Sequence, residues 1–447
     1  MIYVCDAIMG SGKTQAAITY MNEHSDGKFI YVTPYLDETE RIANDCKGLR
    51  FYKPKKKDGS KVRDSVGKLR EGKNIATTHQ AFRNYTQEMA ELITAQGYTL
   101  IIDESIQSFE PCDIDDGDIE LLKRAGYLEE SDDGESAYRV SNTAEYKGSK
   151  FKDFMFHARS QKLTRIDGKC DSVLEESDDD GSNDGNGYKS KNVFYWSLTP
   201  ELLSSFKDVF ILTYLFEAQD ISAFLTVHGL HFGRMGVEKI DAGNGYRFKE
   251  GAGSVAGYEA DIMDLIEIIG DEKMNSIGDG TYSLSKNWYK KSSNKEAVTQ
   301  LKNNIYNVLR HKWEESKSGE RMWSTFKAYK GKLKGNGYTT SFVALNERAS
   351  NKYRGRKYLA YACNIFMPVD MKSFLSENGV PFDEDKYALS VMLQWIWRSA
   401  IRDGEKIHLY LPSSRMRRIL YEWMDSISGE GGEVPVGRGF DSGTNAA

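Results

Sequence analysis

The chain has 447 residues, which is enough for two or three domains of ordinary size. Its 66 acidic and 60 basic residues give a formal net charge of −6, which excludes a globally basic nucleic-acid coat but not a local basic track. Hydrophobic residues make up 40% of the chain and include 26 Tyr, 20 Phe and 7 Trp, so a sizeable core is expected and global disorder is excluded.

The sequence gives no sign of a membrane span or a secreted protein. No apolar run approaches the roughly 18 residues that a span needs, and the N-terminus lacks the regions of a signal peptide. The five cysteines are widely spaced, which is not the pattern of a disulfide framework or a zinc knuckle. His228 and His231 lie three residues apart, but no third metal ligand accompanies them. We therefore expect a cytoplasmic protein, in the host cytoplasm if it is viral.

The first 105 residues alternate short apolar runs with helix-like segments. Strands are expected at 2–6, 28–33, near 77 and at 100–102, and helices at 15–22 and 37–45. Strands and helices that alternate at this spacing predict an α/β fold with a parallel, doubly wound sheet. A further buried strand is expected at 209–213, and we place the end of the first domain near residue 220.

Residues 106–192 are rich in Asp, Gly and Ser and predict an irregular acidic insertion in the first domain. The most acidic block, 171–184, is typical of a solvated loop, and the alternative is an arm that mimics DNA or binds a partner. The second domain is expected over 221–427, with strands around 340–344 and 406–411 and a helix at about 386–402. Residues 428–447 are glycine-rich and predict a disordered tail.

The segment Ala7-Ile8-Met9-Gly10-Ser11-Gly12-Lys13-Thr14 matches a phosphate-binding loop, except that Ala7 stands where the first glycine is usual. Gly10 and Gly12, with Ser11 between them, let the backbone N–H groups form a nest for a phosphate. Lys13 is expected to reach the β- and γ-phosphates of ATP, and the Thr14 hydroxyl to bind Mg²⁺. A strand before the loop and a helix after it give the expected context.

A second signal follows the apolar run at 100–102, where Asp103 and Glu104 stand at the end of the expected strand. Asp103 is suited to hold Mg²⁺ through water, and Glu104 to act as general base toward an attacking water molecule. About ninety residues after a phosphate-binding loop, such a pair predicts a nucleoside triphosphatase.

Together with other segments, these residues resemble the superfamily 2 DNA helicases, particularly compact phage-type and origin-binding-protein-like members. Val32-Thr33-Pro34-Tyr35 and Asn74 to Phe82 resemble motifs Ia and Ib, which implies contacts to the nucleic-acid backbone from Thr33, Pro34, Tyr35, Thr77, Thr78 and His79. Asp103-Glu104 is similar to motif II. Leu212-Thr213-Tyr214 lies where motif III would fall, without the usual Ser-Ala-Thr.

The segment Gln394 to Arg402 is similar to motif VI, which implies that Gln394, Arg398 and Arg402 act at the γ-phosphate. Arg402 lies eight residues after Gln394, where the family has seven. On an expected helix over 386–402, Arg398 keeps the family spacing and is therefore the better candidate finger. The alternative is a solvated cationic face. The sequence shows no counterpart of the family's adenine-reading glutamine motif, so base specificity is left open.

Clusters of basic residues supply the polymer-binding hypothesis. Lys327 and Lys330, with Lys332 and Lys334, interleave with Phe326 and Tyr329. The other clusters are 53–63, 353–357 and 415–418, and 346–351 loosely resembles motif V. Each cluster alone is ordinary solvated surface, but together they suit a phosphate backbone held without base readout.

The resemblance implies two RecA-like P-loop NTPase domains that use ATP and Mg²⁺ to unwind or move along DNA, in phage-type replication or recombination and in contact with replication proteins. One alternative is a viral DNA-packaging terminase, which would need a nuclease for which only Asp370, Asp383, Glu384 and Asp385 offer carboxylates. Another is an ATP-dependent origin-binding or loader switch that separates no strands. A nucleoside kinase fits the large second domain poorly.

Overall fold

The computed structural model describes residues 1–34, 36–55, 61–131, 137–141, 146–166, 193–240, 245–254, 258–347 and 351–428. The chain divides into two compact units, the first of Met1–Val255 with Met367–Ser390 and the second of Ala256–Phe366 with Val391–Ala447. The boundary expected near residue 220 thus falls inside the first unit, because two strands at 232–250 extend its sheet. Among the described residues, no helix is both long and apolar enough to span a membrane.

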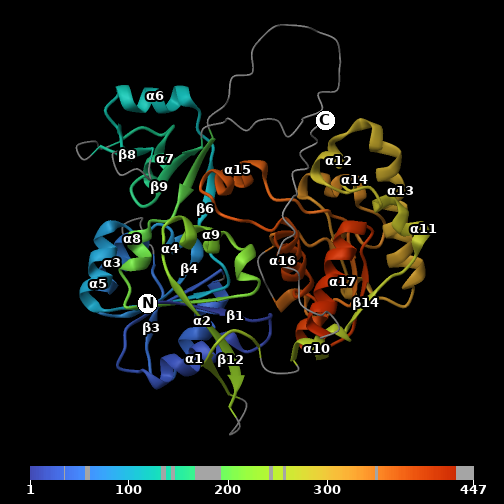
Figure 1. The fold of residues 1–447 in the computed structure, drawn as a ribbon, viewed down its shortest axis with the longest axis horizontal. Helices are drawn as coiled ribbons and strands as arrows, with labels where there is room; N and C mark the ends of the chain where they lie inside the picture. The colour runs from blue at the N-terminus through green and yellow to red at the C-terminus, as the bar shows by residue number, and fades with distance from the viewer. Residues whose placement is uncertain are drawn as a thin grey trace, which may run out of the picture. The chain divides into compact units, whose positions relative to one another are not determined.

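The first unit is built on an eight-stranded sheet with the order β13-β12-β1-β11-β5-β2-β4-β3 (Figure 1). All neighbouring strands are parallel except β13, which runs antiparallel to β12. The strands are β1 (Ile2–Asp6), β2 (Phe29–Thr33), β3 (Phe51–Tyr52), β4 (Asn74–Thr78), β5 (Thr99–Asp103), β11 (Asp208–Thr213), β12 (Phe232–Lys239) and β13 (Tyr246–Glu250). The α/β prediction with parallel sheets and two domains is confirmed.

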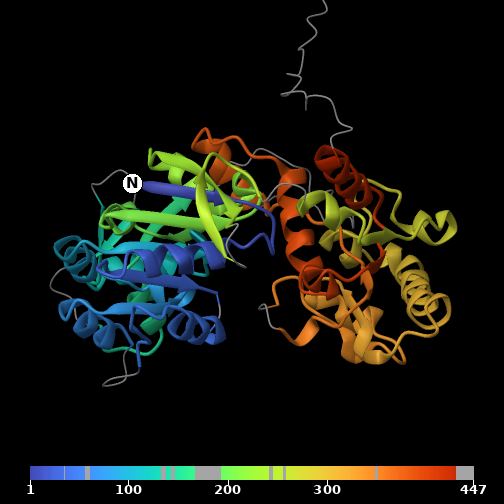
Figure 2. The same cartoon turned by 90° about the horizontal axis from the view of Figure 1, so that it is seen from below.

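Helices cover both faces of this sheet, so its strands are apolar on both sides (Figure 2). Along β2, Ile30 and Val32 belong to one core cluster, and Tyr31 between them belongs to the other. The Tyr31 face packs against α1 (Lys13–Glu23) and α2 (Leu36–Asp45). The opposite face packs against α3 (Lys61–Arg70), α4 (His79–Phe82), α5 (Gln87–Gln96), α8 (Pro200–Ser204) and α9 (Asp220–Val227).

The insertion is more regular than predicted. Its described residues form a five-stranded antiparallel sheet of order β6-β10-β9-β8-β7, with α6 (Asp116–Arg124) and α7 (Lys152–His157). The strands are β6 (Phe109–Cys112), β7 (Leu128–Glu130), β8 (Tyr138–Val140), β9 (Lys162–Ile166) and β10 (Val193–Ser197). Leu128, Leu163 and Trp196 help to form a separate core, which the polar composition obscured. The acidic block 171–184 lies outside the described residues.

A segment from the later part of the chain, 367–390, packs on the first unit. Within it, Phe374 of α15 (Val369–Glu377) contacts Phe109 with ring centroids 4.6 Å apart, and the Gln219 amide donates to Ser390 Oγ at 2.6 Å. Its apolar residues extend the core of the first sheet, although the sequence assigned them to the second domain.

The second unit contains a four-stranded parallel sheet of order β14-β17-β16-β15, surrounded by helices. Its strands are β14 (Ile266–Ile268), β15 (Arg321–Ser324), β16 (Tyr358–Tyr361) and β17 (Ile407–Tyr410). Its helices are α10 (Tyr258–Met263), α11 (Glu272–Asn275), α12 (Lys286–Lys290), α13 (Lys295–Asn307), α14 (Lys330–Leu333) and α17 (Ser414–Ser428), while α16 (Glu384–Ile396) includes residues of both units. A disordered tail was predicted for 428–447; residue 428 is the last residue of α17, and 429–447 lie outside the described residues.

Two predicted elements of this region are wrong. The strand expected around 340–344 is a 3₁₀ turn at Thr339–Ser341 followed by a single bridge between Phe342 and Trp323. The helix expected to reach residue 402 ends at Ile396, because the N–H of Ala400 bonds to the Arg356 carbonyl at 2.9 Å instead of continuing the helix. Arg398 therefore lies in a turn and Arg402 in a 3₁₀ helix, Ala400–Asp403.

Asp220 provides a pH-dependent test of how the insertion is attached. Its carboxylate accepts the N–H of Ser108 at 2.8 Å, and burial raises its pKa from 3.8 to about 6. Because the folded state holds this proton to a higher pH than the unfolded chain does, the group lowers the free energy of unfolding as pH rises from about 4 to about 6, by up to about 3 kcal/mol.

We expect Asp220→Asn, which cannot ionise, to flatten the fall in unfolding free energy over this pH window. Urea unfolding of both proteins at pH 4.5, 5.5 and 6.5 measures the difference. Identical pH dependence in the two proteins would show that Asp220 titrates normally.

Candidate active site

The candidate site lies at one edge of the first sheet, where neighbouring parallel strands end. Strands β1, β11, β5, β2 and β4 lie side by side in that order and end at Asp6, Thr213, Asp103, Thr33 and Thr78. Ligands of open α/β sheets bind outside the carboxyl ends of such strands. The alternation of strands and helices thus brings the phosphate-binding loop and the segments predicted as motifs Ia, Ib, II and III to a common edge of the first sheet.

The phosphate-binding loop connects β1 to α1. Gly10 and Gly12 have φ of 83° and 93°, a conformation that favours glycine, and Gly12 is the N-cap of α1. Among the described non-glycine residues, positive φ occurs only at Glu104, Leu215 and Leu284, so Ala7 takes an ordinary conformation. That explains why alanine can replace the usual first glycine. The loop leaves N–H groups of the first turn of α1 available to an anion.

Lys13 is held inside this loop. Its ammonium group donates to the carbonyl oxygens of Ala7 and, at 2.9 Å, of Ile8. Burial lowers the pKa of Lys13, and nearby acidic groups oppose that shift. An anion of high charge density placed beside the ammonium would offset the cost of its burial.

The Asp103 carboxylate joins three elements. Thr14 Oγ1 at the start of α1 donates to it at 3.0 Å, and the Tyr31 hydroxyl on β2 donates to the same oxygen at 2.6 Å. Burial, with the neighbouring Asp103 charge, raises the pKa of Tyr31 well above its usual value, so the phenol stays protonated and remains a donor. Sequence reasoning missed Tyr31. Its only signal was a polar-tipped ring within an apolar strand.

His79 has a partner other than the one that the motif resemblance implied. Its Nε2 lies 3.0 Å from the Asp103 backbone carbonyl, and burial lowers its pKa to about 4. A neutral imidazole N–H that bonds this carbonyl fixes the end of β5. The Thr78 hydroxyl accepts the Ala81 N–H at 3.4 Å and caps α4. The structure thus gives both side chains contacts inside the first unit.

Glu104 follows Asp103 in a strained backbone conformation. Its φ is 62°, which is unusual for a non-glycine residue. Its side chain is exposed. Leu215, two residues past the neighbouring strand β11, also has a positive φ, 53°. Strain of this kind is often found at functional sites, where it directs a side chain that a relaxed turn would place elsewhere.

The other residues on this edge that are predicted to contact nucleic acid are largely buried where the structure describes them. Thr33 and Thr77 are 1% and 3% exposed, and Pro34 is half-buried. The Thr33 hydroxyl is buried and has no hydrogen-bond partner among the described residues. Tyr35 lies outside the described residues. Thr33, Pro34 and Thr77 thus lie at the same edge of the sheet as the loop, and their side chains are largely covered.

The predicted motif VI residues Gln394, Arg398 and Arg402 belong to the second unit. Helix α16, which carries Gln394, begins with residues of the first unit. Gln394 and Arg402 are exposed, whereas Arg398 is 8% exposed and donates to the Leu345 carbonyl at 2.9 Å. Since the helix ends at Ile396, the helical spacing that favoured Arg398 over Arg402 does not hold.

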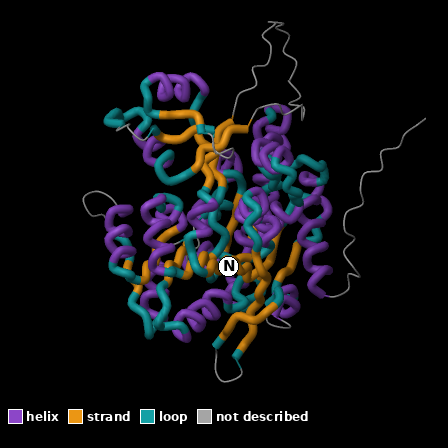
Figure 3. Tube along the Cα trace, turned by 60° about the vertical axis from the view of Figure 1, so that its left-hand side comes forward, coloured by secondary structure: helices purple, strands orange, loops and turns teal. Residues whose placement is uncertain are grey.

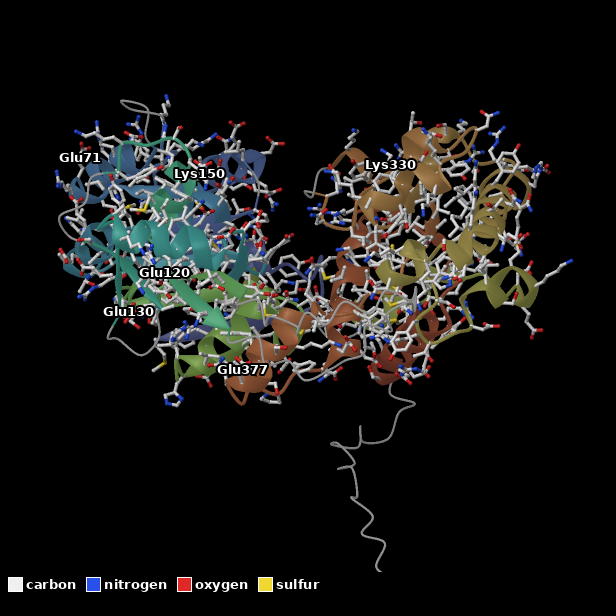
Figure 4. All side chains as sticks on the ribbon, turned by 90° about the horizontal axis from the view of Figure 1, so that it is seen from above. Glu71, Glu120, Glu130, Lys150, Lys330 and Glu377 are labelled. Atoms are coloured by element: carbon white, nitrogen blue, oxygen red, sulfur yellow. The ribbon has the colours of Figure 1, made fainter. Side chains whose placement is uncertain are left out.

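The basic cluster after β15 is at the surface of the second unit (Figure 4). Lys327 is exposed, and the Lys330 ammonium lies 4.5 Å from the centre of the Phe342 ring. Lys332 donates to the Tyr289 carbonyl at 3.0 Å. Other predicted basic residues already have partners, Lys53 with Glu40, Arg354 with Asp403, Lys357 with Glu405 and Arg418 with Glu422. Lys56, Lys57 and Arg348 lie outside the described residues.

Two of the carboxylates considered for a nuclease, Asp383 and Glu384, have structural roles. Asp383 accepts the N–H groups of Asp385 and Lys386, and Glu384 accepts the Met367 N–H at 3.1 Å. Nowhere in the described part of the chain do three or more His, Cys, Asp or Glu side chains form a group that could hold a metal ion.

A separate cavity of about 670 Å³ lies in the first unit, between the inserted sheet and the ends of α9 and α15. Its lining mixes rings, such as Tyr138 and Phe374, with Arg165 and the acidic Glu130 and Glu377, both labelled in Figure 4. No predicted motif residue lines it.

Sequence comparison places the chain in a family. It is 34% identical over 435 residues, 95% of this chain and 99% of the relative, to the SPbeta prophage-derived uncharacterized protein YonV of Bacillus subtilis (strain 168). The chain belongs to the YonV family. A family profile described as the YonV C-terminal Rossmann-like domain also matches residues 260–424, which include all four strands of the second sheet.

Solved structures share a more distant likeness with this YonV-family chain. The structure of S. tokodaii Xpd4 is 13% identical, with 94% of each chain covered and a TM-score of 0.46. An apo XPD structure is 11% identical, with 94% of this chain and 95% of its own covered and a TM-score of 0.38. Both scores are below 0.5, so the fold described above rests on the strand pairing of this chain.

The role of His79 leads to a direct test. We expect its imidazole to stay neutral from pH 8 down to about 5, because the lowered pKa makes the charged form unfavourable in the folded state. NMR titration of histidine-labelled protein, with His79→Gln to assign the signal, measures this. Titration of His79 between pH 6 and 7 would show that it is solvated and free to act as a cation.

Proposed function

We propose that this chain is an ATP hydrolase that moves along or unwinds nucleic acid, with DNA as the favoured polymer. The observation that carries the proposal is the contact between Thr14 and Asp103, which brings the end of the phosphate-binding loop against the acidic residue after β5. These two residues are 89 positions apart in the sequence. Their meeting beside Lys13 is the arrangement that an NTP and a divalent cation require.

The residues present fit Mg-ATP. Gly10, Ser11 and Gly12 form the backbone nest for the phosphates, and Lys13 supplies a cation beside it. Thr14 and Asp103 would hold Mg²⁺ with oxygen ligands, the type that this cation prefers, alongside phosphate oxygens and water. When bound, the cation neutralises charge that builds up on the transferring phosphoryl group.

Glu104 is the proposed general base. Its side chain is exposed at the site edge, whereas Asp103 is occupied by the Thr14 and Tyr31 hydroxyls. Asp103 and Glu104 are adjacent but have different surroundings, so one can hold the cation while the other accepts a proton from water. The strained φ of Glu104 is consistent with this assignment.

The second unit is proposed to contribute Gln394 and an arginine to the γ-phosphate. Arg402 is now the better candidate for movement toward a phosphate, because it is exposed. Arg398 is buried and donates to the Leu345 carbonyl, so its first role is to hold the turn after α16. The sequence ranking of these two arginines is therefore reversed in the proposal.

Polymer contacts are proposed at two places. On the first unit, Thr33, Thr77 and Thr78 lie at the carboxyl ends of β2 and β4, on the same edge of the sheet as the loop, and Pro34 follows β2. Tyr35, the next residue in the sequence, is proposed with them. On the second, Lys330 supplies positive charge beside the Phe342 ring, and the exposed Lys327 adds a second charge three residues earlier in the chain. Such contacts hold a phosphate backbone and leave the base sequence unread. The prophage origin of the Bacillus subtilis relative supports a role in phage replication or recombination, inside the host cell.

The proposal is tested by ATPase rates measured in parallel with no polymer, single-stranded DNA, duplex DNA and RNA, followed by a strand-separation assay. Stimulation by DNA with strand separation supports a helicase. Stimulation without separation favours a translocase or an origin-binding switch. The absence of ATP turnover under every condition would contradict the proposal.

Two substitutions should separate binding from chemistry. Lys13→Ala should weaken ATP binding by about 10- to 100-fold, because the phosphates lose charged hydrogen bonds. Glu104→Gln should keep binding and lower turnover by about 10²- to 10⁴-fold, because only the base is removed. Nucleotide titration and single-turnover hydrolysis measure the two effects, and normal hydrolysis by the Gln variant would exclude Glu104 as the base.

Salt dependence should locate the polymer contact. Affinity for single-stranded DNA should fall steeply with salt, and Lys327→Gln with Lys330→Gln should reduce the slope of log K against log salt by about 1.4, because each lysine that neutralises a phosphate of a single strand adds ~0.7 to that slope. The matched control is Lys286→Gln with Lys295→Gln, which changes the charge equally at exposed positions of the same unit. Equal slopes in the two double variants would place the track elsewhere.

A further inference from the structure

The antiparallel arm β12–β13, with the turn at 251–254, contacts the phosphate-binding loop near both of its ends. Near the start of the loop, the Ile8 N–H donates to Ser254 Oγ at 3.1 Å. At its end, a Cβ added to Gly12 would lie 2.3 Å from a ring carbon of Tyr246. Figure 3 shows β12 and β13 side by side, extending beyond the helices of the first unit. No sequence motif marked either residue.

Hydrogen bonds and ring packing of the arm hold the turn at 251–254 and β13 in place. The Val237 N–H bonds to the Gly253 carbonyl at 3.0 Å, and any Cβ at Gly236 would lie 2.6 Å from that oxygen. The turn can therefore lie flat against β12, which brings Ser254 to the loop. Phe248 anchors the middle of β13, because its ring stacks on Phe210 with centroids 5.5 Å apart.

Tyr246 differs from Phe248 in its position. It is the first residue of β13, two positions before this anchor, and it is half-buried against the loop at the point where α1 begins. An aromatic ring beside the loop offers a π-face to a flat, apolar group. If the loop holds the phosphates of a nucleotide, the base lies outside the loop and requires a separate apolar surface close to it.

We propose that Tyr246 is the stacking platform for the base of a purine nucleoside triphosphate held by residues 10–14. The inference rests on the proposed function, which it deepens by naming the element that receives the base. A stacking surface recognises ring area rather than a hydrogen-bond pattern. ATP and GTP are therefore expected to bind with similar affinity, and CTP and UTP more weakly.

The experiment compares two ligands on the full-length protein by calorimetry. A non-hydrolysable ATP analogue, AMPPNP, carries a base, and inorganic tripolyphosphate has only the phosphates. Tyr246→Ala and Tyr246→Leu should each weaken AMPPNP binding by about tenfold or more and leave tripolyphosphate binding unchanged. Tyr246→Phe, which keeps the ring, should bind both ligands as the wild type does. Phe248→Leu is the matched control for loss of a ring elsewhere on β13.

The outcomes distinguish this inference from its alternatives. Unchanged AMPPNP binding by the Ala and Leu variants overturns it, and so does an equal loss for both ligands, which would mean that the ring only supports the loop. Tighter binding of both ligands also overturns it, because the ring would then be a cover that competes with the phosphates. If the wild-type protein binds neither ligand, the proposed function fails as well.

Discussion

The Asp103 carboxylate organises the edge of the first sheet on which the candidate site depends. It accepts hydroxyl donors from α1 and β2, and the backbone carbonyl of the same residue lies beside the His79 imidazole at the start of α4. A buried carboxylate is costly unless its oxygens are bonded, so loss of these donors would leave a charge without compensation. The hydroxyl of Thr14 donates to Asp103, and in the proposed function the same hydroxyl would also bind the cation.

The insertion is connected to the same region by polar contacts. Arg83, which follows α4, pairs with Glu110 on β6 and donates to Gln161 at 3.0 Å. Asp220 at the start of α9 accepts the Ser108 N–H that precedes β6. Arg83 is separated from the end of β4 only by α4, and Asp220 is separated from the end of β11 only by a short segment with the 3₁₀ turn Phe216–Ala218. A movement of the inserted sheet would therefore reach α4 and α9 through directed bonds that act at short range.

Much of the first unit could be predicted because its signals are local. The phosphate-binding loop needs glycine at two positions with positive φ, and the buried strands are continuous apolar runs. Each of these signals can be recognised from a short stretch of consecutive residues. Such stretches failed at Phe342 and at Ala400, where a bond to a distant strand or loop decides the backbone. Helix and strand propensities and hydrophobic periodicity describe neighbouring residues, so they cannot predict bonds between residues that are far apart in the sequence. The burial of Arg398 was missed for the same reason, since its partner at Leu345 is 53 positions away.

In the proposed nucleotide site, the residues for the phosphates and the residue for the base differ in the same way. The phosphate end is specified by eight consecutive residues, because charge and backbone N–H groups act at short range and must be placed together. The base end needs only a ring at the right place, and any part of the chain that folds back can supply one. Tyr246 is 234 residues after Gly12 in sequence yet contacts it, and it does so because β12 pairs with β1 and carries β13 over α1. Strand order in the sheet, rather than a motif, therefore determines which side chain the base would meet.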